Sequence, residues 1–264
     1  MDGRIIKENP GTVKLPIIGK VKIGMKNEKG FPVSLDYFMV GDDCKYKSYF
    51  DKSYPDKPNK IQIIFISDDI REICNERYEL RTKSGDLFGD GDGRNFRIWN
   101  KEKKEYLEYD LAKHPDLLVR SAKAAESPKG WQVILTLRFI IPAIKGVLGQ
   151  WQLSTKGEKS SINAIRDTFD FVHLRAGSVT RIAFDLTVQK VKSQKPNDPS
   201  LYPVINLVPN VSDENLALVQ GFIESNKSLP MITDEIIERE KMLTESTENK
   251  VPDCFNYDVK EIDG

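Results

Sequence analysis

The sequence predicts an α+β fold whose body is a predominantly antiparallel β-sheet with two or three packed helices. Three observations support this prediction: segments of alternating hydrophobicity outnumber segments with helical spacing, the predicted helices fall between strands, and acidic segments with helical spacing replace the strands after Pro209. We expect an acidic C-terminal tail there, partly helical and partly disordered. The chain has 264 residues, enough to bury a core without disulfides.

The first strands lie in a lysine-rich stretch. Apolar and basic residues alternate over residues 18–26, a turn leads to a second strand at 34–40, and residues 41–59 are typical of a loop. Residues 60–66 are a near-continuous apolar run, which indicates a strand buried on both faces.

A capped helix and a glycine-rich segment follow that strand. Ser67 or Asp68 can accept hydrogen bonds from the first N–H groups of a helix that runs to about Cys74. Residues 77–81 are expected to form a strand. Four glycines within residues 85–93 predict a turn or a backbone nest.

Residues 94–130 are the least regular part of the body and form a possible insertion. We expect a small hairpin from residues 95–99 and 105–109, and a partly helical segment over 111–125. Alternation over the eleven residues 131–141 then predicts a long strand.

A strand at 149–154 and the clearest helix of the sequence, at 160–175, come next. Ser160 or Ser161 is expected to cap this helix, and apolar residues at three- and four-residue spacing mark one buried stripe. Gly177 stands where a C-terminal cap belongs.

The last strands of the body are expected at residues 180–192 and 201–208, where apolar residues alternate again. An amphipathic helix is expected after Ser212 or Asp213, and a second, acidic helix over 232–243. We expect the final twenty residues to be disordered.

The distribution of charge separates an acidic C-terminal tail from the rest of the chain. We predict an N-terminal arm over residues 1–17, a core domain over 18–211 and an acidic tail over 212–264. Of 40 basic and 40 acidic residues, the tail holds 5 and 13, so it carries −8 and the rest carries +8. A basic body favours a polyanionic partner, and the tail would compete for that surface or recruit partners. A tail that merely aids solubility has the same composition.

Cysteines and histidines are few and far apart. Cys44, Cys74 and Cys254 form no CxxC pair, and His114 and His173 are isolated, so we expect no metal and no cofactor. Unpaired cysteines fit a reducing cytoplasm, and no apolar run is long enough to span a membrane. We therefore expect a cytoplasmic protein without a membrane partner.

Basic and aromatic residues on several strands are candidates for binding single-stranded DNA by charge and stacking. Trp131 is in phase with the apolar side of its strand, so Trp151 is the better stacking candidate. Residues 154–161 lack the GxxxxGK[ST] spacing but can still bind a phosphate at a helix N-terminus. Amphipathic strands and a capped helix would give the same pattern without a ligand. The candidates are Lys20, Lys22, Lys26, Arg138, Trp151, Lys156, Lys159, Lys190 and Lys192.

Two groups of acids are candidates for a metal-dependent phosphoesterase. Asp68 and Asp69 follow a buried strand, and Asp90 and Asp92 lie in the glycine-rich segment. A helix cap and a glycine turn account for the same residues. The spacing of the two histidines suggests no catalytic triad, and we expect no enzymatic activity.

Four segments, in order, resemble the family of actinophage-type recombination directionality factors. They are GKVKIG at 19–24 with PVSLDYF at 32–38, KIQIIFISDDIREI at 60–73, FGDGDGR at 88–94, and residues 137–192 with the run GQWQLSTKGEKSSINAIRD. The resemblance covers about residues 18–208. The matching positions are Asp36, Phe38, Ser67, Asp68, Asp69, Gly89, Asp90, Gly91, Thr155, Ser161 and Ile162.

This resemblance implies a non-enzymatic phage or mobile-element protein, in the cytoplasm of a bacterial host, that binds a serine integrase on DNA and replaces integration with excision. We expect a groove or strand edge that takes an integrase helix. Many relatives carry cysteines after the GDG segment, whereas residues 94–130 contain none, so no metal site is carried over. A single-stranded DNA-binding protein with a regulatory acidic tail is the alternative, and the phosphoesterase is a third.

Overall fold

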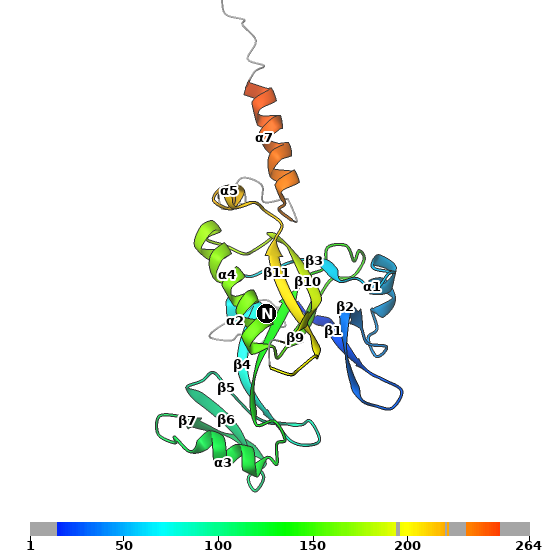
Figure 1. Cartoon of the computed structure of the whole chain (residues 1–264). Coiled ribbons are helices and arrows are strands. Elements are labelled where there is room, and N and C mark those ends of the chain that lie inside the picture. Colours follow the sequence, from blue (N-terminus) through cyan, green and yellow to red (C-terminus); the bar gives the residue numbers. More distant parts are fainter. Residues whose placement is uncertain (1–14, 194–195, 220, 222–230, 249–264) are drawn as a thin grey trace, which may run out of the picture.

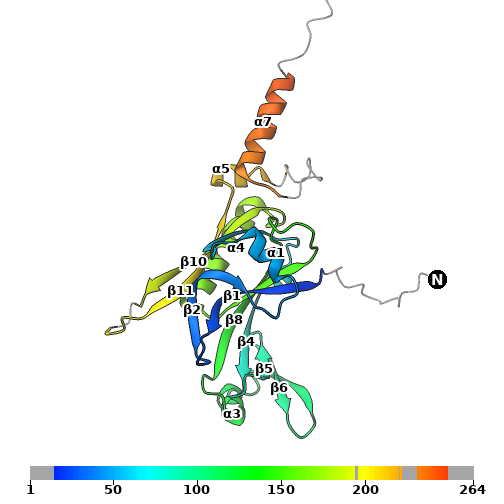
Figure 2. The ribbon, with the colours of Figure 1, turned by 90° about the vertical axis from the view of Figure 1, so that its right-hand side faces the viewer.

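The computed structural model describes residues 15–193, 196–219, 221 and 231–248, and of residues 158–159 and 243–248 it describes the backbone alone. Most of the predicted arm and the end of the predicted tail lie outside this part. A central body carries a smaller lobe at one end and helix α7 at the opposite end (Figures 1 and 2). The architecture is α+β with a large, mostly antiparallel sheet, as the sequence predicts.

Eight strands form the large sheet, in the order β2-β1-β9-β8-β4-β5-β6-β7. All neighbours are antiparallel except β1 and β9, which run parallel. The strands are β1 (Ile17–Lys26), β2 (Pro32–Val40), β4 (Cys74–Arg81), β5 (Leu87–Gly91), β6 (Asn95–Asn100), β7 (Glu105–Asp110), β8 (Trp131–Phe139) and β9 (Gln150–Thr155).

A second sheet has three antiparallel strands in the order β11-β10-β3: β11 (Leu201–Pro209), β10 (Ala183–Lys192) and β3 (Lys60–Ile64). A bridge between Ile64 and Ile140 joins the two sheets. The hairpin of β10 and β11 reaches outward from the body (Figure 2).

The helices are mostly short. They are α1 (Lys47–Ser53), α2 (Ile70–Ile73), α3 (Leu117–Ala124), the π-helical turn η1 (Glu158–Ile162) that continues into α4 (Asn163–Ala176), α5 (Asp213–Leu216) and α7 (Asp234–Glu248). Helix α4 buries the predicted stripe and ends at Gly177, whose φ of 70° is left-handed, as expected for its cap.

Two clusters of buried side chains hold the molecule together. In the main core, the ring of Phe65, just past β3, lies 4.9 Å from Phe169 of α4 and 5.3 Å from Phe184 of β10. The smaller cluster, around Leu80 and Phe88, lies in the lobe formed by β5, β6, β7 and α3. Because β4 and β8 run from one cluster to the other, they fix the lobe to the body.

The segment after residue 211 contributes to the main core. Leu216, Val219, Ile232 and Ile237 are all buried there. The carboxylate of Asp234 accepts hydrogen bonds from the backbone N–H of Ser212 at 2.9 Å and from Asn215 Nδ2 at 2.8 Å, so the start of α7 is tied to α5.

Two predicted loops are wrong in part. Residues 41–59 include helix α1, which buries Phe50 beneath it. The glycine-rich segment 85–93 turns only at its ends, where Gly85 and Gly93 have left-handed φ values of 96° and 97°, and residues 87–91 between them form strand β5. At Gly91, the ring of Phe96 on β6 occupies the space that a side chain would fill. These glycines allow an aromatic ring to approach the backbone closely.

The predicted helix caps are also wrong in detail. Helix α2 is capped by Asp69, whose Oδ1 accepts from the backbone N–H of Arg71 at 2.9 Å, and not by Ser67 or Asp68. Neither serine caps α4: the chain enters that helix through η1, and Ser161 instead bonds to β11.

Candidate functional site

The two faces of the large sheet carry different side chains. Leu135, Leu137 and Phe139 of β8 point into the main core and are fully buried. Because successive residues of a strand point to opposite faces, Thr136 and Arg138 point the other way. We call this second, polar side of the sheet the open face.

A row of polar side chains crosses the open face on three adjacent strands. Lys20 of β1 pairs with Gln152 of β9, and Gln152 pairs with Arg138 of β8. At about 4.8 Å between neighbouring strands, the row spans about 10 Å. The Nε atom of Arg138 is buried and has no hydrogen-bond partner in the described part of the chain.

A groove opens next to this row, where β1 separates from β9. The parallel pairing ends at Val21 and Leu153, although β1 continues to Lys26 in pairing with β2. The β1–β2 register shifts between Lys22 and Gly24, and an irregularity of this kind bends a strand, which accounts for the separation. The fork leaves an unpaired edge on each strand.

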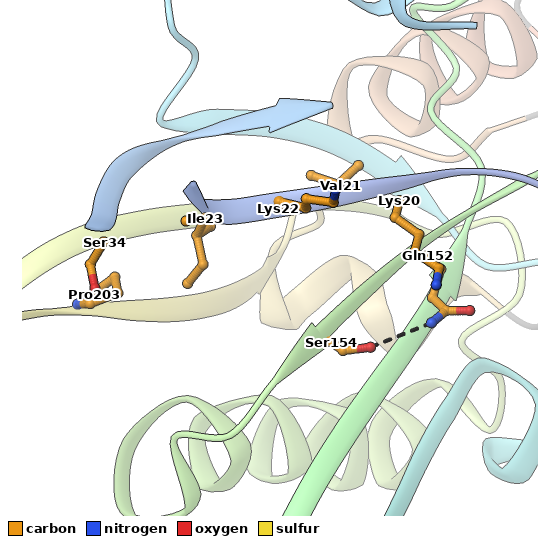
Figure 3. Close-up of a pocket in the computed structure, with 9 residues that line it drawn as sticks. Lys20, Val21, Lys22, Ile23, Ser34, Gln152, Ser154 and Pro203 are labelled. Atoms are coloured by element: carbon orange, nitrogen blue, oxygen red, sulfur yellow. Dashed lines mark hydrogen bonds between the residues drawn. The ribbon is translucent and has the colours of Figure 1, made fainter. Parts of the chain in front are cut away.

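The groove has a volume of about 340 Å3, an apolar floor and a polar rim. Figure 3 shows Ile23 directed from β1 toward the strand that carries Pro203, with Lys20 and Gln152 side by side. The residues that line the groove are Lys20, Val21, Lys22, Ile23, Gly24, Ser34, Gln152, Ser154 and Pro203.

The rim combines cations with hydrogen-bonding groups. Lys22 Nζ lies 3.8 Å from a carboxylate oxygen of the exposed Asp43, whereas Lys20 has no ion-pair partner among the described residues. Gln152 Nε2 donates to Ser154 Oγ at 3.4 Å, and Ser154 Oγ lies 3.1 Å from Thr136 Oγ1. Such a rim can hold an acidic segment above an apolar floor.

The structure brings only some of the predicted nucleic-acid-binding residues together. Lys20 and Lys22 line the groove, and Arg138 lies beside it. Lys190 pairs with Pro203 in the second sheet and therefore shares the face of that residue. The exposed Lys26 and Lys192 stand at strand ends, Lys156 lines a different pocket, and the side chain of Lys159 lies outside the described part.

The prediction that Trp151 stacks on a nucleobase is wrong. Its side chain is 1% exposed and lies on the core side of β9, where its ring packs 5.9 Å from that of Phe50. The backbone of Gly19 lies against the indole so closely that a Cβ there would overlap it. Trp151 therefore fixes β1 beside β9 and supports the groove from behind.

Several residues of the family motif hold the fold together. Asp68, just past β3, accepts hydrogen bonds from Ser178 Oγ at 2.9 Å and from the backbone N–H of Val179 at 2.7 Å, so it ties β3 to the loop after α4. The hydroxyl of Ser161, which is 1% exposed, accepts from the backbone N–H of Ile205 at 2.9 Å.

The remaining motif residues have similar contacts. The buried Asp90 accepts two hydrogen bonds from Arg97, at 2.9 and 2.7 Å, and pairs with Arg77 at 3.1 Å, which links β4, β5 and β6. The side chains of Phe38, Thr155 and Ile162 are buried. Ser67 Oγ accepts a hydrogen bond from the N–H of Asp69, and Gly89 lies in β5 beside the ring of Trp131. Asp36, in contrast, is exposed on β2.

The acids considered for a phosphoesterase have structural partners of this kind. Asp92 Oδ1 accepts from the backbone N–H groups of Asn95 at 2.6 Å and Arg94 at 2.9 Å, which lowers the pKa of its carboxyl. Within the described ranges, no group of three His, Cys, Asp or Glu side chains is placed to hold a metal ion.

Of the nine residues that line the groove, sequence reasoning had proposed only Lys20 and Lys22 as site residues, and Ser154 only as the start of a possible phosphate-binding loop. The residues that it did not propose are Val21, Ile23, Gly24, Ser34, Gln152 and Pro203. The alternation in GQWQLS was a usable signal for two lining residues, since it places Gln152 and Ser154 opposite the buried Trp151 and Leu153. Ser34 and Pro203 come from separate sheets, and no sequence pattern joins them.

Comparison with known proteins gives the family of the chain but no individual relative. No helix among the described residues is long and apolar enough to cross a membrane. No curated protein and no solved structure matched the chain. A family model described as Gp3-like, recombination directionality factor-like, matches residues 18–210, which include both sheets and helix α4. The chain belongs to the Gp3-like, recombination directionality factor-like family.

Proposed function

We propose that this protein is a non-enzymatic recombination directionality factor that binds a serine integrase and favours excision over integration. The observation that carries the proposal is the family match over residues 18–210, which covers the entire β-body rather than a fragment of it. The protein would act in the cytoplasm of a bacterial host, where the integrase excises a phage or mobile element from the chromosome.

We propose the groove at the β1–β9 fork as the integrase contact. Its floor includes Ile23 and Pro203, and its rim carries Lys20 and Lys22. Grooves with an apolar floor take amphipathic helices, and free strand edges take extended segments. The lysines favour acidic side chains on the integrase segment, which we take to be a helix.

Binding acts here as an allosteric effect on the integrase. A factor that binds one synaptic arrangement more tightly than the other shifts the equilibrium by the difference between the two binding free energies. A shift from 1:99 to 99:1 needs a difference of about 5.5 kcal/mol. A single protein interface of ordinary size can supply this difference without any chemical step.

The test is a recombination assay with a cognate serine integrase and DNA substrates for integration and for excision. The wild-type protein is expected to raise excision and to suppress integration. The variant carrying both Lys20→Glu and Lys22→Glu is expected to need at least about tenfold more protein for the same effect, since each loss of about 1.4 kcal/mol costs a factor of ten.

The matched control is Lys29→Glu, which reverses a charge at an exposed position of the same hairpin, outside the groove. It is expected to behave as the wild type. An integrase whose ratio of integration to excision does not respond to the wild-type protein would overturn the function. A double variant as active as Lys29→Glu would move the contact away from the groove.

Binding of single-stranded DNA is the second candidate. The row from Lys20 to Arg138 and the charge of +8 on residues 1–211 favour it. Without Trp151 as a stacking platform, such binding would rest on charge, so we expect it to weaken steeply with salt and to differ little between single strands and duplexes.

A further inference from the structure

A second pocket lies on the open face, at the end of the sheet next to the lobe. It has a volume of about 180 Å3 and collects three cationic side chains from three segments: Arg81 at the end of β4, Lys129 in the loop before β8, and Lys156 just after β9. Among the described side chains of its lining, Glu79 is the one acid against three cations.

Two of the three cations are held in place. Arg81 donates from Nε to Glu79 at 2.9 Å and from Nη1 to the carbonyl oxygen of Gly85 at 2.9 Å. Lys156 Nζ donates to Gln132 Oε1 at 3.2 Å, which leaves two of its N–H groups free. Lys129 has no hydrogen-bond or ion-pair partner within the described ranges.

The described lining of the pocket therefore carries more positive than negative charge. Burial lowers the pKa of the Lys156 ammonium, and the positive charges of Arg81 and Lys129 lower it further. A bound anion would reverse this effect, because it would interact favourably with all three cations at once.

We propose that this pocket binds a phosphate group of a DNA backbone. A phosphate suits this lining: the ammonium groups of Lys129 and Lys156 supply two point charges, and Arg81, paired with Glu79 at 2.8 Å, supplies a fixed guanidinium. Lys156 lies two residues beyond Ser154, which lines the groove, and this places the two sites about 7 Å apart along β9.

The location favours a chain of phosphates over a single free anion. The pocket and the row of Lys20 and Arg138 occupy the same face of the sheet, so one sugar–phosphate backbone can run from one to the other. Each phosphate neutralised releases counterions and adds to the affinity.

The test measures DNA binding by the full-length protein through the fluorescence anisotropy of a labelled duplex, over a series of salt concentrations. Lys156→Gln, Arg81→Gln and Lys129→Gln are each expected to weaken binding about tenfold at low salt, and to reduce the slope of log affinity against log salt by about one. Lys156→Arg, which keeps the charge, is expected to retain affinity within about threefold.

The matched control is Lys83→Gln, in the same β4–β5 turn as the pocket but outside its lining. It is expected to reduce affinity less than twofold. If the three pocket variants bind DNA as Lys83→Gln does, or if the wild-type protein binds no DNA, the proposal is overturned. The assay contains no integrase, so such a result leaves the proposed function standing.

A chemical readout separates DNA from free phosphate and works even if a variant folds poorly. The Lys156 amine of the wild-type protein is expected to react with an acylating reagent near pH 8 faster than a lysine of ordinary pKa, because its lowered pKa leaves a larger fraction of the amine neutral. The duplex is expected to slow this reaction at least about fivefold, as read by mass spectrometry. Protection by inorganic phosphate but not by DNA would overturn the DNA assignment.

Discussion

At the scale of single residues, several residues of the family motif make hydrogen bonds that join one element of the fold to another. Ser161 is the clearest case. Its hydroxyl is the acceptor for the buried N–H of Ile205 and joins the entry of α4 to the central part of β11. A serine that caps a helix accepts instead from an N–H group of the first turn of its own helix, and the sequence pattern alone predicted that local role.

Ser161→Ala is expected to lower the free energy of unfolding by about 1–3 kcal/mol, because it leaves a buried N–H without a partner. Urea denaturation followed by circular dichroism measures the change. Ser160→Ala, at the neighbouring half-buried serine, is expected to stay within about 0.5 kcal/mol of the wild type. Equal effects for the two variants would contradict the role of this hydrogen bond.

The groove was only partly predictable at this scale. Lys20 and Lys22 were proposed together because they lie on one strand, and the alternation of that strand, a local property, puts both on the same face. Trp151 was misplaced although the alternation in GQWQLS sets it in phase with the apolar Leu153. What the pattern of β9 does not show is the partner on that side, α1 with its Phe50, about a hundred residues earlier in the chain.

At the scale of elements, β5 shows how composition can mislead. The glycines of residues 85–93 predicted a turn throughout, yet residues 87–91 pair with β4 and β6, and the ring of Phe96 covers Gly91. Turns form only at the ends of the segment, at Gly85 and at Asp92–Gly93, and the second is closed by the hydrogen bonds that Asp92 accepts. Pairing partners on both sides outweighed the intrinsic preference of glycine for turns.

This turn predicts an acid-sensitive contribution to stability. The backbone N–H groups of Asn95 and Arg94 lower the pKa of Asp92 below its ordinary value of 3.8. A carboxyl whose pKa is lower in the folded state stabilises the fold above its unfolded pKa, and this contribution is lost as the pH falls through the folded pKa. The loss is therefore expected below about pH 4.

Asp92→Asn is expected to flatten the dependence of the unfolding free energy on pH between about 4 and 2.5, because the amide accepts hydrogen bonds without titrating. Denaturation at a series of pH values measures the slope. Asp56→Asn, at an exposed carboxylate without a described partner, is expected to keep the wild-type slope. A slope that Asp92→Asn leaves unchanged would contradict the assignment.

At the scale of the whole molecule, charge and packing divide the chain differently. The sequence separates residues 212–264 by their acidity, but Leu216, Ile232 and Ile237 are buried in the main core. Acidic side chains on a helix surface dominate the composition of a segment, whereas a few apolar side chains decide whether it packs. A split in charge is therefore weak information about where a body ends.

Ile237→Ala is expected to destabilise the protein by about 2–5 kcal/mol, as for other large-to-small changes in a core. Met242→Ala, five residues further along α7 at a residue that is 67% exposed, is expected to change stability by less than about 0.5 kcal/mol. Chemical denaturation compares them. If Ile237→Ala is as mild as Met242→Ala, α7 does not contribute to the core.

The parallel pairing of β1 with β9 also sets when each edge of β1 can be covered during synthesis of the chain. Lys20 finds its partner Gln152 only 132 positions later, so at about 5–20 residues per second the first hairpin waits on the order of ten seconds beside the ribosome. Its free edge is exposed to other nascent chains during that interval. The lysines along it discourage edge-to-edge pairing, which gives them a protective role before the groove exists.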